Sequence, residues 1–251
     1  MHIGKYRIAD VVIQIESLYP GIHRMCQGYI CQENMPAQIT VRIQPEDIAF
    51  EKHKSEQEAL AEGKLPNDLH EGYLETLAVY RKLAEAMLAG QDTLLFHGSA
   101  IAAEGKAVLF TAKSGTGKST HTRLWREMLG DGCFMVNDDK PLLRIRDTDT
   151  KVCGTPWNGK HRLGTNCMVP LAAICILRQG QTNEITQISF TEALPELLQQ
   201  SYRPADRQKL PLLLKLLGTM AANVRFYRLS CNMEPDAAKL AYETILGSQA
   251  R

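Results

Sequence analysis

The sequence predicts an α/β fold in which a phosphate-binding loop joins a buried strand to a helix. Residues 107–110 form a compact apolar run that is typical of a buried strand. Residues 111–120, Thr-Ala-Lys-Ser-Gly-Thr-Gly-Lys-Ser-Thr, fit the phosphate-binding loop pattern. Apolar residues then recur at helical spacing from Leu124 to Leu129, and Gly130 follows where a helix would end. Strand, loop and helix in this order favour a phosphate site over an ordinary glycine-rich turn.

The residue types of this loop match what a nucleotide requires. Gly115 and Gly117 let backbone N–H groups turn inward and form a concave anion site. Lys118 would place positive charge on the β- and γ-phosphates, and the Ser119 hydroxyl would bind the Mg²⁺ that bridges them. The residues predicted to bind ATP are Ser114, Gly115, Thr116, Gly117, Lys118, Ser119 and Thr120.

Composition excludes several classes of partner. The chain has 251 residues, 44% of them hydrophobic, and a formal net charge of +1, which gives no support for nucleic-acid binding. No apolar run approaches a membrane span, and the first residues do not resemble a signal peptide. Seven cysteines without a Cys-x-x-Cys pair indicate reduced thiols. We therefore expect a cytoplasmic protein with no nucleic-acid or membrane partner, and the composition is compatible with a homo-oligomer.

Residues 1–90 are expected to form an accessory α+β region, rich in strands, without recognisable chemistry. Its expected elements are strands at 6–15, 28–31 and 39–43, a loop or linker at 51–67, and a helix from Glu71 to Gly90. His23, Cys26 and Cys31 are close in sequence, but their spacing fits no standard zinc pattern. Unliganded side chains are favoured over a metal site.

A hairpin is predicted where residues 94–103 and 106–111 flank the two-residue turn Glu104-Gly105. A two-residue turn pairs residue 103 with residue 106, so the numbers of paired residues add up to 209. This register places His97 opposite Ala112, at the base of the phosphate-binding loop. A packed strand histidine is the alternative to a functional imidazole, and the register leaves the two readings evenly balanced.

A second short apolar run, Cys133–Val136, ends in Asn137-Asp138-Asp139. Carboxylates at the end of a buried strand, about twenty residues after the loop, suit a Mg²⁺-binding aspartate. The adjacent aspartate could accept a proton from a substrate hydroxyl. A solvated turn is the alternative, because Asp-Asp often marks one.

Another hairpin is predicted for 142–146 and 151–155 around the turn 147–150, with Asn158 opposite Asp139. The loop Gly154–Arg162 should therefore border the aspartates and contact the acceptor, although a basic surface turn is the alternative. The residues predicted to bind the acceptor are Trp157, Asn158, Lys160 and Arg162. The remaining expected elements are strands at 171–177, 184–190 and 224–229 and helices at 191–201, 207–220 and 236–246.

The set formed by His97-Gly98, Ser114–Ser119 and Val136–Asp139 resembles the HPr kinase/phosphorylase family over about residues 94–246. This resemblance implies a nucleotide-binding fold shared with phosphoenolpyruvate carboxykinases, here a P-loop kinase core at 91–251. It also implies catalytic roles for Lys118, for Asp139 as the base and for His97 near the transferred phosphate, with Asp138 and Ser119 holding the metal.

The chain differs from HPr kinases at two places. Thr120 stands where they have a glutamate, and the Trp157 loop replaces their glycine-rich segment near the protein substrate. Both differences favour another acceptor. We therefore expect an ATP- and Mg²⁺-dependent kinase that phosphorylates a serine-like hydroxyl of a peptide or small molecule. The alternatives are an HPr-type protein serine kinase, a nucleotide-binding switch or ATPase serving a partner, and a carboxykinase-like lyase.

Overall fold

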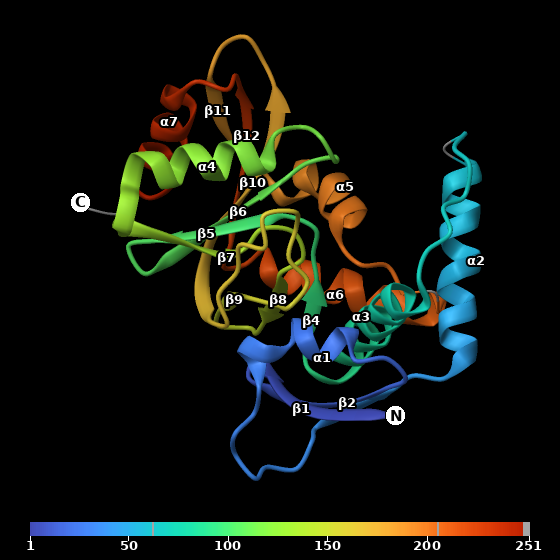
Figure 1. Cartoon of the computed structure of the whole chain (residues 1–251). Coiled ribbons are helices and arrows are strands. Elements are labelled where there is room, and N and C mark those ends of the chain that lie inside the picture. Colours follow the sequence, from blue (N-terminus) through green and yellow to red (C-terminus); the bar gives the residue numbers. More distant parts are fainter. Residues whose placement is uncertain (62, 205, 248–251) are drawn as a thin grey trace. The chain divides into compact units, whose positions relative to one another are not determined.

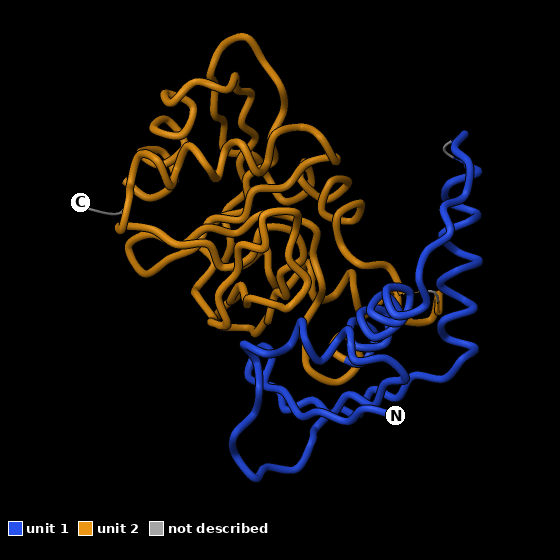
Figure 2. Tube along the Cα trace, viewed as in Figure 1, with its two compact units in different colours: residues 1–86 blue, residues 87–251 orange. Residues whose placement is uncertain are grey.

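The protein divides into two compact units, Met1–Ala86 and Met87–Arg251 (Figure 2). The computed structural model describes residues 1–61, 63–204 and 206–247. The boundary between the units falls inside helix α3 (Glu71–Gly90).

The first unit contains a three-stranded sheet of order β1-β2-β3. Its strands are β1 (His2–Ile8), β2 (Val11–Ser17) and β3 (Ile39–Arg42). The single strand expected at 6–15 is wrong, because Ala9 and Asp10 form a tight antiparallel turn between β1 and β2. Both residues have positive φ angles, 52° and 60°, as the two-residue hairpin requires. The run of apolar residues on both sides conceals this turn in the sequence.

The helices of this unit are α1 (Gly21–Met25), α2 (Pro45–Ala61) and the first part of α3. The prediction of a loop at 51–67 is wrong for residues 51–61, which belong to α2. Charged groups hold this helix to α3. Arg81 contacts Glu51 at 2.6 Å, and Lys82 contacts Asp47 at 2.6 Å. A polar helix of this kind lacks the apolar stripe by which helices are recognised in a sequence.

The expected strand at 28–31 is also wrong. Residues Gln27–Tyr29 form a 3-10 turn, and only Ile30 makes a bridge to the sheet, through Tyr6. The two ring nitrogens of His23 lie within hydrogen-bond distance of the hydroxyls of Tyr6 and Ser17, at 2.6 and 2.8 Å.

The second unit is built on a mixed sheet of nine strands (Figure 1). The strands are β4 (Thr93–Leu95), β5 (Ser99–Ala103), β6 (Lys106–Thr111), β7 (Cys133–Asn137), β8 (Leu142–Ile145), β9 (Thr150–Cys153), β10 (Met168–Gln179), β11 (Glu184–Ile188) and β12 (Arg225–Cys231). Their order is β4-β8-β9-β10-β6-β5-β7, with β12 paired to β10 and β11 paired to β12. The long strand β10 joins the parts of the sheet, because its start pairs with β9 and its later residues pair with β12.

Helices cover both faces of this sheet, which confirms the α/β class. The helices are α4 (Lys118–Leu129), α5 (Phe190–Gln200), α6 (Leu210–Met220) and α7 (Pro235–Ile245). Alternate residues of β6 point to opposite faces: Leu109 joins the apolar cluster of α5 and α6, whereas Phe110 joins that of α4 and α7. In the described parts of the chain, no helix has the length and apolar character that crossing a membrane requires.

The first predicted hairpin is confirmed in its register, since Ser99 pairs with Phe110 and Ala103 with Lys106. Its first strand is shorter than expected, because β4 pairs with β8 instead and the chain departs from the sheet at His97 and Gly98. A side chain at Gly98 would lie 2.9 Å from both the carbonyl oxygen of Phe110 and a methyl of Leu109, so this close crossing requires glycine.

The second hairpin forms with a register two residues away from the predicted one. Leu142 pairs with Cys153 and Ile145 with Thr150, so Asn158 is not the strand partner of Asp139. The turn is shorter than expected because Thr150 belongs to β9, where its hydroxyl donates to the Asn223 side chain at 2.7 Å.

The strand directions bring three sequence motifs to one edge of the sheet. β6 and β7 are both antiparallel to β5, which lies between them. The carboxyl ends of β6 and β7 therefore lie beside the start of β5. These ends lead into the residues 112–117, which we call the glycine loop, and into Asn137–Asp139, and the start of β5 follows His97-Gly98. Ligands of open α/β sheets bind at such an edge.

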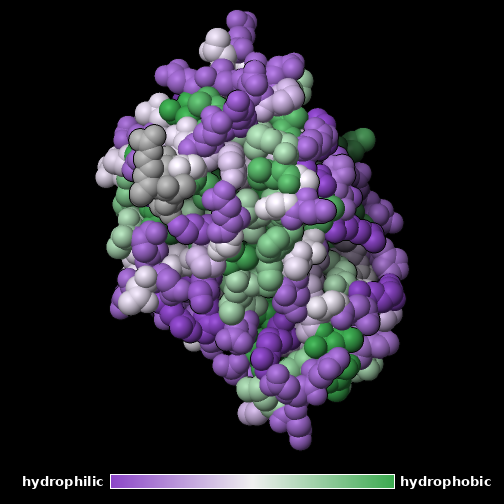
Figure 3. Space-filling view, turned by 90° about the vertical axis from the view of Figure 1, so that its left-hand side faces the viewer, coloured by the Kyte–Doolittle hydropathy of each residue, from purple (hydrophilic) through white to green (hydrophobic). Residues whose placement is uncertain are grey.

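Exposed apolar side chains also occur away from this edge. In the second unit the large ones are Met128, Phe134, Met168, Leu214 and Met233. Figure 3 shows hydrophobic residues gathered in the middle of one face, with hydrophilic residues around them. The sheet edge is the candidate site, because the strand directions bring the three motifs together there.

His121 in α4 gives the core a pH dependence. Its ring packs against Phe110 with 4.6 Å between ring centroids, and its Nε2 accepts from Trp125 Nε1 at 3.2 Å. Burial lowers the pKa of His121 from 6.5 to about 4. The unfolded chain therefore binds a proton that the folded chain does not, and stability falls as pH drops from 6.5 to 4.

We expect His121 to account for about 3 kcal/mol of stability lost over that interval. His121→Gln keeps an acceptor for Trp125 but does not titrate, so its urea midpoint should depend less on pH. Midpoints of both proteins at pH 7 and pH 4.5 check this, with the exposed His161→Gln as the control. Equal pH dependence in wild type and His121→Gln would contradict the assignment.

Candidate nucleotide and phosphoryl-transfer site

The glycine loop connects β6 to α4 with a backbone that only glycine adopts readily. Gly115 and Gly117 have φ angles of 81° and 118°, and a Cβ at either position would meet no atom within 4 Å. The space above them is therefore open, while the conformation itself requires glycine. Lys113, Ser114 and Gly115 are exposed at the surface. This geometry is suited to an anion that approaches the backbone closely.

Lys118 lies under the loop rather than in solvent. Its side chain is buried, and Nζ donates to the carbonyl oxygen of Ala112 at 2.9 Å. Burial lowers the pKa of Lys118, and the negative charge of Asp139 partly opposes this. An anion bound in the loop would favour the charged ammonium further.

Asn137, which sequence reasoning did not select, fixes the turn that carries the two aspartates. Its Oδ1 accepts from the backbone N–H groups of Asp139 and Lys140 at 2.9 and 2.6 Å. Its Nδ2 lies 3.0 Å from Asn158 Oδ1 and 3.1 Å from Thr155 Oγ1. Asn137 is fully buried, so a single side chain joins the aspartate turn to the following loop. The dense polar pattern Asn-Asp-Asp is the only sequence signal for this role.

Asp138 is buried at the same edge and shares a pocket of about 400 Å³ with Ser119. Its backbone carbonyl accepts from Ser99 Oγ at 2.9 Å, and its Oδ1 accepts from the N–H of Gly159 at 2.7 Å. The described residues include no cluster of three His, Cys, Asp or Glu side chains. One carboxylate and one hydroxyl suit Mg²⁺, which usually keeps waters and takes further ligands from substrate phosphates.

Asp139 faces His97 across the edge of the sheet. Its Oδ1 lies 3.4 Å from His97 Nε2, and Lys140 Nζ lies 3.9 Å from its Oδ2. The backbone reinforces the pair, because Gly98 N–H donates to the carbonyl oxygen of Asp139 at 2.9 Å. The structure therefore brings together two of the three side chains, His97 and Asp139, to which the resemblance gave catalytic roles.

Gln200, at the end of α5, orients the imidazole and was not predicted. His97 Nδ1 lies 2.7 Å from Gln200 Oε1, and the His97 backbone N–H donates to the Gln200 carbonyl at 2.8 Å. Burial lowers the pKa of His97, with a further contribution from the charge on Lys118. In the neutral tautomer that carries its hydrogen on Nδ1, this hydrogen is donated to Gln200 Oε1 and Nε2 faces Asp139 with a free electron pair.

The loop Gly154–Arg162 borders the aspartates, but not in the predicted manner. Trp157 is 5% exposed, so its ring is part of the interior and offers no open face to an acceptor. Asn158 is bound to Asn137. Lys160 and Arg162 are exposed, and neither lines the pocket that Asp138 shares with Ser119 or the pocket beside the glycine loop.

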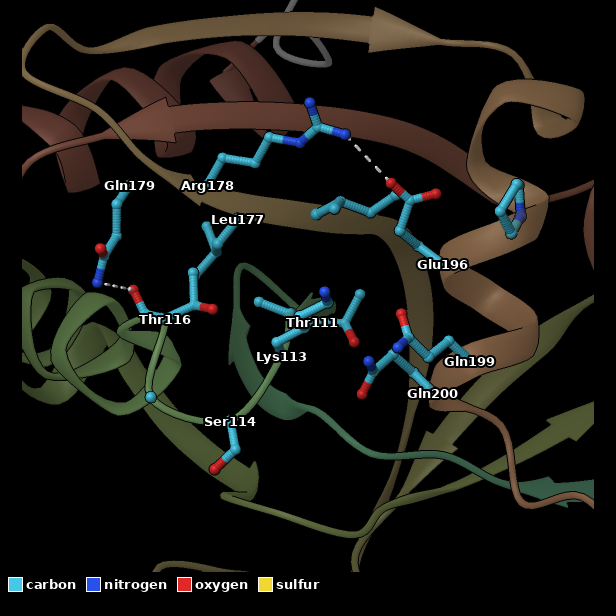
Figure 4. Close-up of a pocket in the computed structure, with 14 residues that line it drawn as sticks. Thr111, Lys113, Ser114, Thr116, Leu177, Arg178, Gln179, Glu196, Gln199 and Gln200 are labelled. Atoms are coloured by element: carbon cyan, nitrogen blue, oxygen red, sulfur yellow. Dashed lines mark hydrogen bonds and ion pairs between the residues drawn. The ribbon is translucent and has the colours of Figure 1, made fainter. Parts of the chain in front are cut away.

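A second pocket, of about 910 Å³, lies between the glycine loop, the end of β10 and α5 (Figure 4). The apolar residues Ile176, Leu177 and Pro195 are among those that line it. Arg178 and Glu196 pair across it at 3.3 Å. Gln200 lines the same pocket and links it to His97.

Comparison with protein families shows where this chain belongs. Residues 74–235 match the family described as SynChlorMet cassette protein ScmC, and the chain therefore belongs to the ScmC family. A comparison with curated protein sequences gives no significant match.

Among solved structures, the chain is similar to "Structure of the Hpr(Ser) kinase/phosphatase from Coxiella burnetii". The two share 10% identity at a TM-score of 0.33, over 62% of this chain and 95% of the other. A likeness at this level supports no conclusion about activity.

Proposed function

We propose that this chain is a kinase that transfers the γ-phosphoryl group of ATP, with Mg²⁺, to a hydroxyl of a small-molecule or peptide acceptor. The observation that carries the proposal is the meeting of three groups at one edge of the sheet. These groups are Lys118 under the glycine loop, Ser119 with Asp138, and His97 with Asp139. Phosphoryl transfer requires mainly positioning and charge neutralisation, and this set supplies both.

The larger pocket is suited to the nucleotide. Its volume of about 910 Å³ lies within the usual range for ligand sites. Ile176, Leu177 and Pro195 offer an apolar wall for a base, and residues 111–116 bring the pocket directly to the glycine loop. The triphosphate would then lie over the N-terminal end of α4, where unpaired backbone N–H groups favour anions.

Ser119 and Asp138 would hold Mg²⁺ between the phosphates and the end of β7. When bound there, the ion would neutralise charge on the β- and γ-phosphates. Gly159 N–H already fixes one oxygen of Asp138 at 2.7 Å, which orients the carboxylate before any ligand arrives.

The acceptor hydroxyl would approach from the side of Asp139. Its oxygen forms a bond to the γ-phosphorus, the bond to the β,γ-bridging oxygen breaks, and ADP leaves with that electron pair. Asp139 takes the hydroxyl proton. The free electron pair of His97 Nε2, 3.4 Å from Asp139 Oδ1, allows the two side chains to share that proton. Gln200 keeps the imidazole in the orientation this needs.

Asp138→Asn is expected to raise the Mg²⁺ concentration needed for tight ATP binding by at least about tenfold, because a neutral amide is a poorer ligand for a hard cation. Calorimetric titration of a non-hydrolysable ATP analogue at increasing Mg²⁺ measures this. Asp131→Asn, at an exposed position, is the matched control and should behave as wild type.

The same titration tests the proposed function itself. Wild-type protein should bind the analogue, and more tightly with Mg²⁺ than with a chelator. Absence of binding, or binding that Mg²⁺ does not affect, would overturn the proposal.

A further inference from the structure

We propose that the pocket along α4 binds a carboxylate or phosphate group of the acceptor, through Arg126 with Arg123 and His161. This inference depends on the proposed kinase function and specifies its substrate class. The pocket has a volume of about 400 Å³ and also contains Ser119, Asp138 and Leu163. A site of this size is suited to a small molecule or a short chain segment.

Among the described residues that line this pocket, Arg126 is the one with a buried, unpaired donor. Its Nε is buried and has no hydrogen-bond partner among the described residues. A buried unpaired donor is costly, and a guanidinium is shaped to bind carboxylate or phosphate through two donors at once. Arg126 also lines the pocket, so an anion bound there would meet its guanidinium charge and the outer N–H donors of the group.

Arg123 and His161 add to this attraction from two different segments. Arg123 contacts Glu127 at 2.6 Å in an exposed pair, which solvent weakens, so this guanidinium can turn toward a stronger anion. His161 comes from the loop after the aspartates and lines the same pocket. The three side chains therefore border one small space.

The positions along α4 set the distance between the anion and the reacting hydroxyl. Ser119, Arg123 and Arg126 lie on neighbouring turns of one helix face, and Ser119 and Arg126 are separated by about 10 Å of helix rise. Long side chains on a helix lean toward its N-terminus, so the guanidinium of Arg126 approaches the metal end. The anionic group of the acceptor would therefore lie within about 10 Å of the metal site.

The two pockets are lined by different parts of the junction between the glycine loop and α4. The proposed anion site is therefore separate from the site of the nucleotide phosphates. The larger pocket is lined by residues 111–116, whereas the pocket along α4 begins at Ser119 and includes Asp138 and His161. The proposal thus assigns the anionic group to two arginines of α4, whereas the sequence predicted Lys160 and Arg162 for this role.

Inorganic phosphate is a suitable probe, because no acceptor needs to be known. The protein is first saturated with Mg²⁺ and a non-hydrolysable ATP analogue, which fills the glycine loop, and phosphate is then titrated by calorimetry. Wild type should bind about one phosphate. Arg126→Met, which keeps the apolar stem, should weaken phosphate binding by at least about tenfold and leave the affinity for the analogue unchanged. Arg146→Met, at an exposed position on the turn after β8, is the matched control and should bind as wild type.

Three results would overturn the inference. Phosphate that binds only without the analogue occupies the glycine loop, and a lower affinity of Arg126→Met for the analogue assigns the arginine to the nucleotide. Equal phosphate binding by wild type and Arg126→Met means an adventitious ion only. If wild type fails to bind the analogue at all, the kinase proposal fails instead. Analogue binding is measured before phosphate is added, so the two failures can be told apart.

Discussion

Lys118→Ala is expected to abolish nucleotide-dependent activity and to weaken ATP binding. The side chain is buried under the glycine loop with Nζ 2.9 Å from the carbonyl oxygen of Ala112. The lysine within the glycine loop, Lys113, is exposed and lines the pocket of about 910 Å³. No second cation of the loop therefore takes the place of Lys118 beneath the phosphates, and the developing negative charge is left without compensation.

The loss should not come from unfolding. Burial already lowers the pKa of Lys118, which means that keeping the ammonium charged in this place costs stability in the absence of a ligand. Lys118→Met, which retains the apolar stem, should melt within a few degrees of wild type and be as inactive as Lys118→Ala. ATP turnover and melting temperature, measured on both variants, check this. Unchanged turnover in either variant would contradict the assignment of the loop.

Asp139→Asn is expected to lower the rate of phosphoryl transfer by about 10²–10⁴-fold, the usual contribution of a positioned base. The amide keeps the shape of the side chain but cannot take the hydroxyl proton. Its backbone contacts to Gly98 and Asn137 remain, so the fold of the turn should be kept. The rate of the chemical step in a single turnover measures the effect.

The two aspartate variants should differ in kind. Asp139→Asn should bind ATP and Mg²⁺ nearly as wild type, whereas Asp138→Asn should require more Mg²⁺. If Asp139→Asn loses Mg²⁺ affinity and keeps its rate at saturating metal, the roles of the two residues are exchanged.

Sequence patterns predict those elements whose structure is set by residues next to one another in the chain. The register of the β5–β6 hairpin follows from Glu104 and Gly105, which adopt φ angles of 53° and 72°, as a two-residue turn requires. The β8–β9 turn contains Asp147, Thr148 and Asp149 without glycine, and its length depends on the distant Asn223. Helix α2 cannot be recognised from its own sequence, because the contact that holds it, between Glu51 and Arg81, joins residues 30 positions apart.

The candidate site shows the same division. Lys118, Ser119 and the aspartate pair belong to compact motifs, and strand directions then place these motifs together. Gln200 could not be predicted as a partner of His97, since 103 residues separate them. In the sequence, Arg123 and Arg126 are typical of the polar face of a helix. Their place in a pocket depends on how α4 lies against Asp138 and His161, which sequence patterns do not predict.

Transfer of labelled phosphate from γ-labelled ATP tests the central claim most directly. The protein, Mg²⁺ and labelled ATP are incubated with a cell extract as the source of acceptors, and the products are identified by mass spectrometry, with Lys118→Ala in a parallel reaction. We expect label on the hydroxyl of a small molecule or peptide that also carries a carboxylate or phosphate, and none with Lys118→Ala. Label found only in inorganic phosphate, or only in unchanged ATP bound to the protein, would contradict the account and indicate an ATPase or a nucleotide-binding switch.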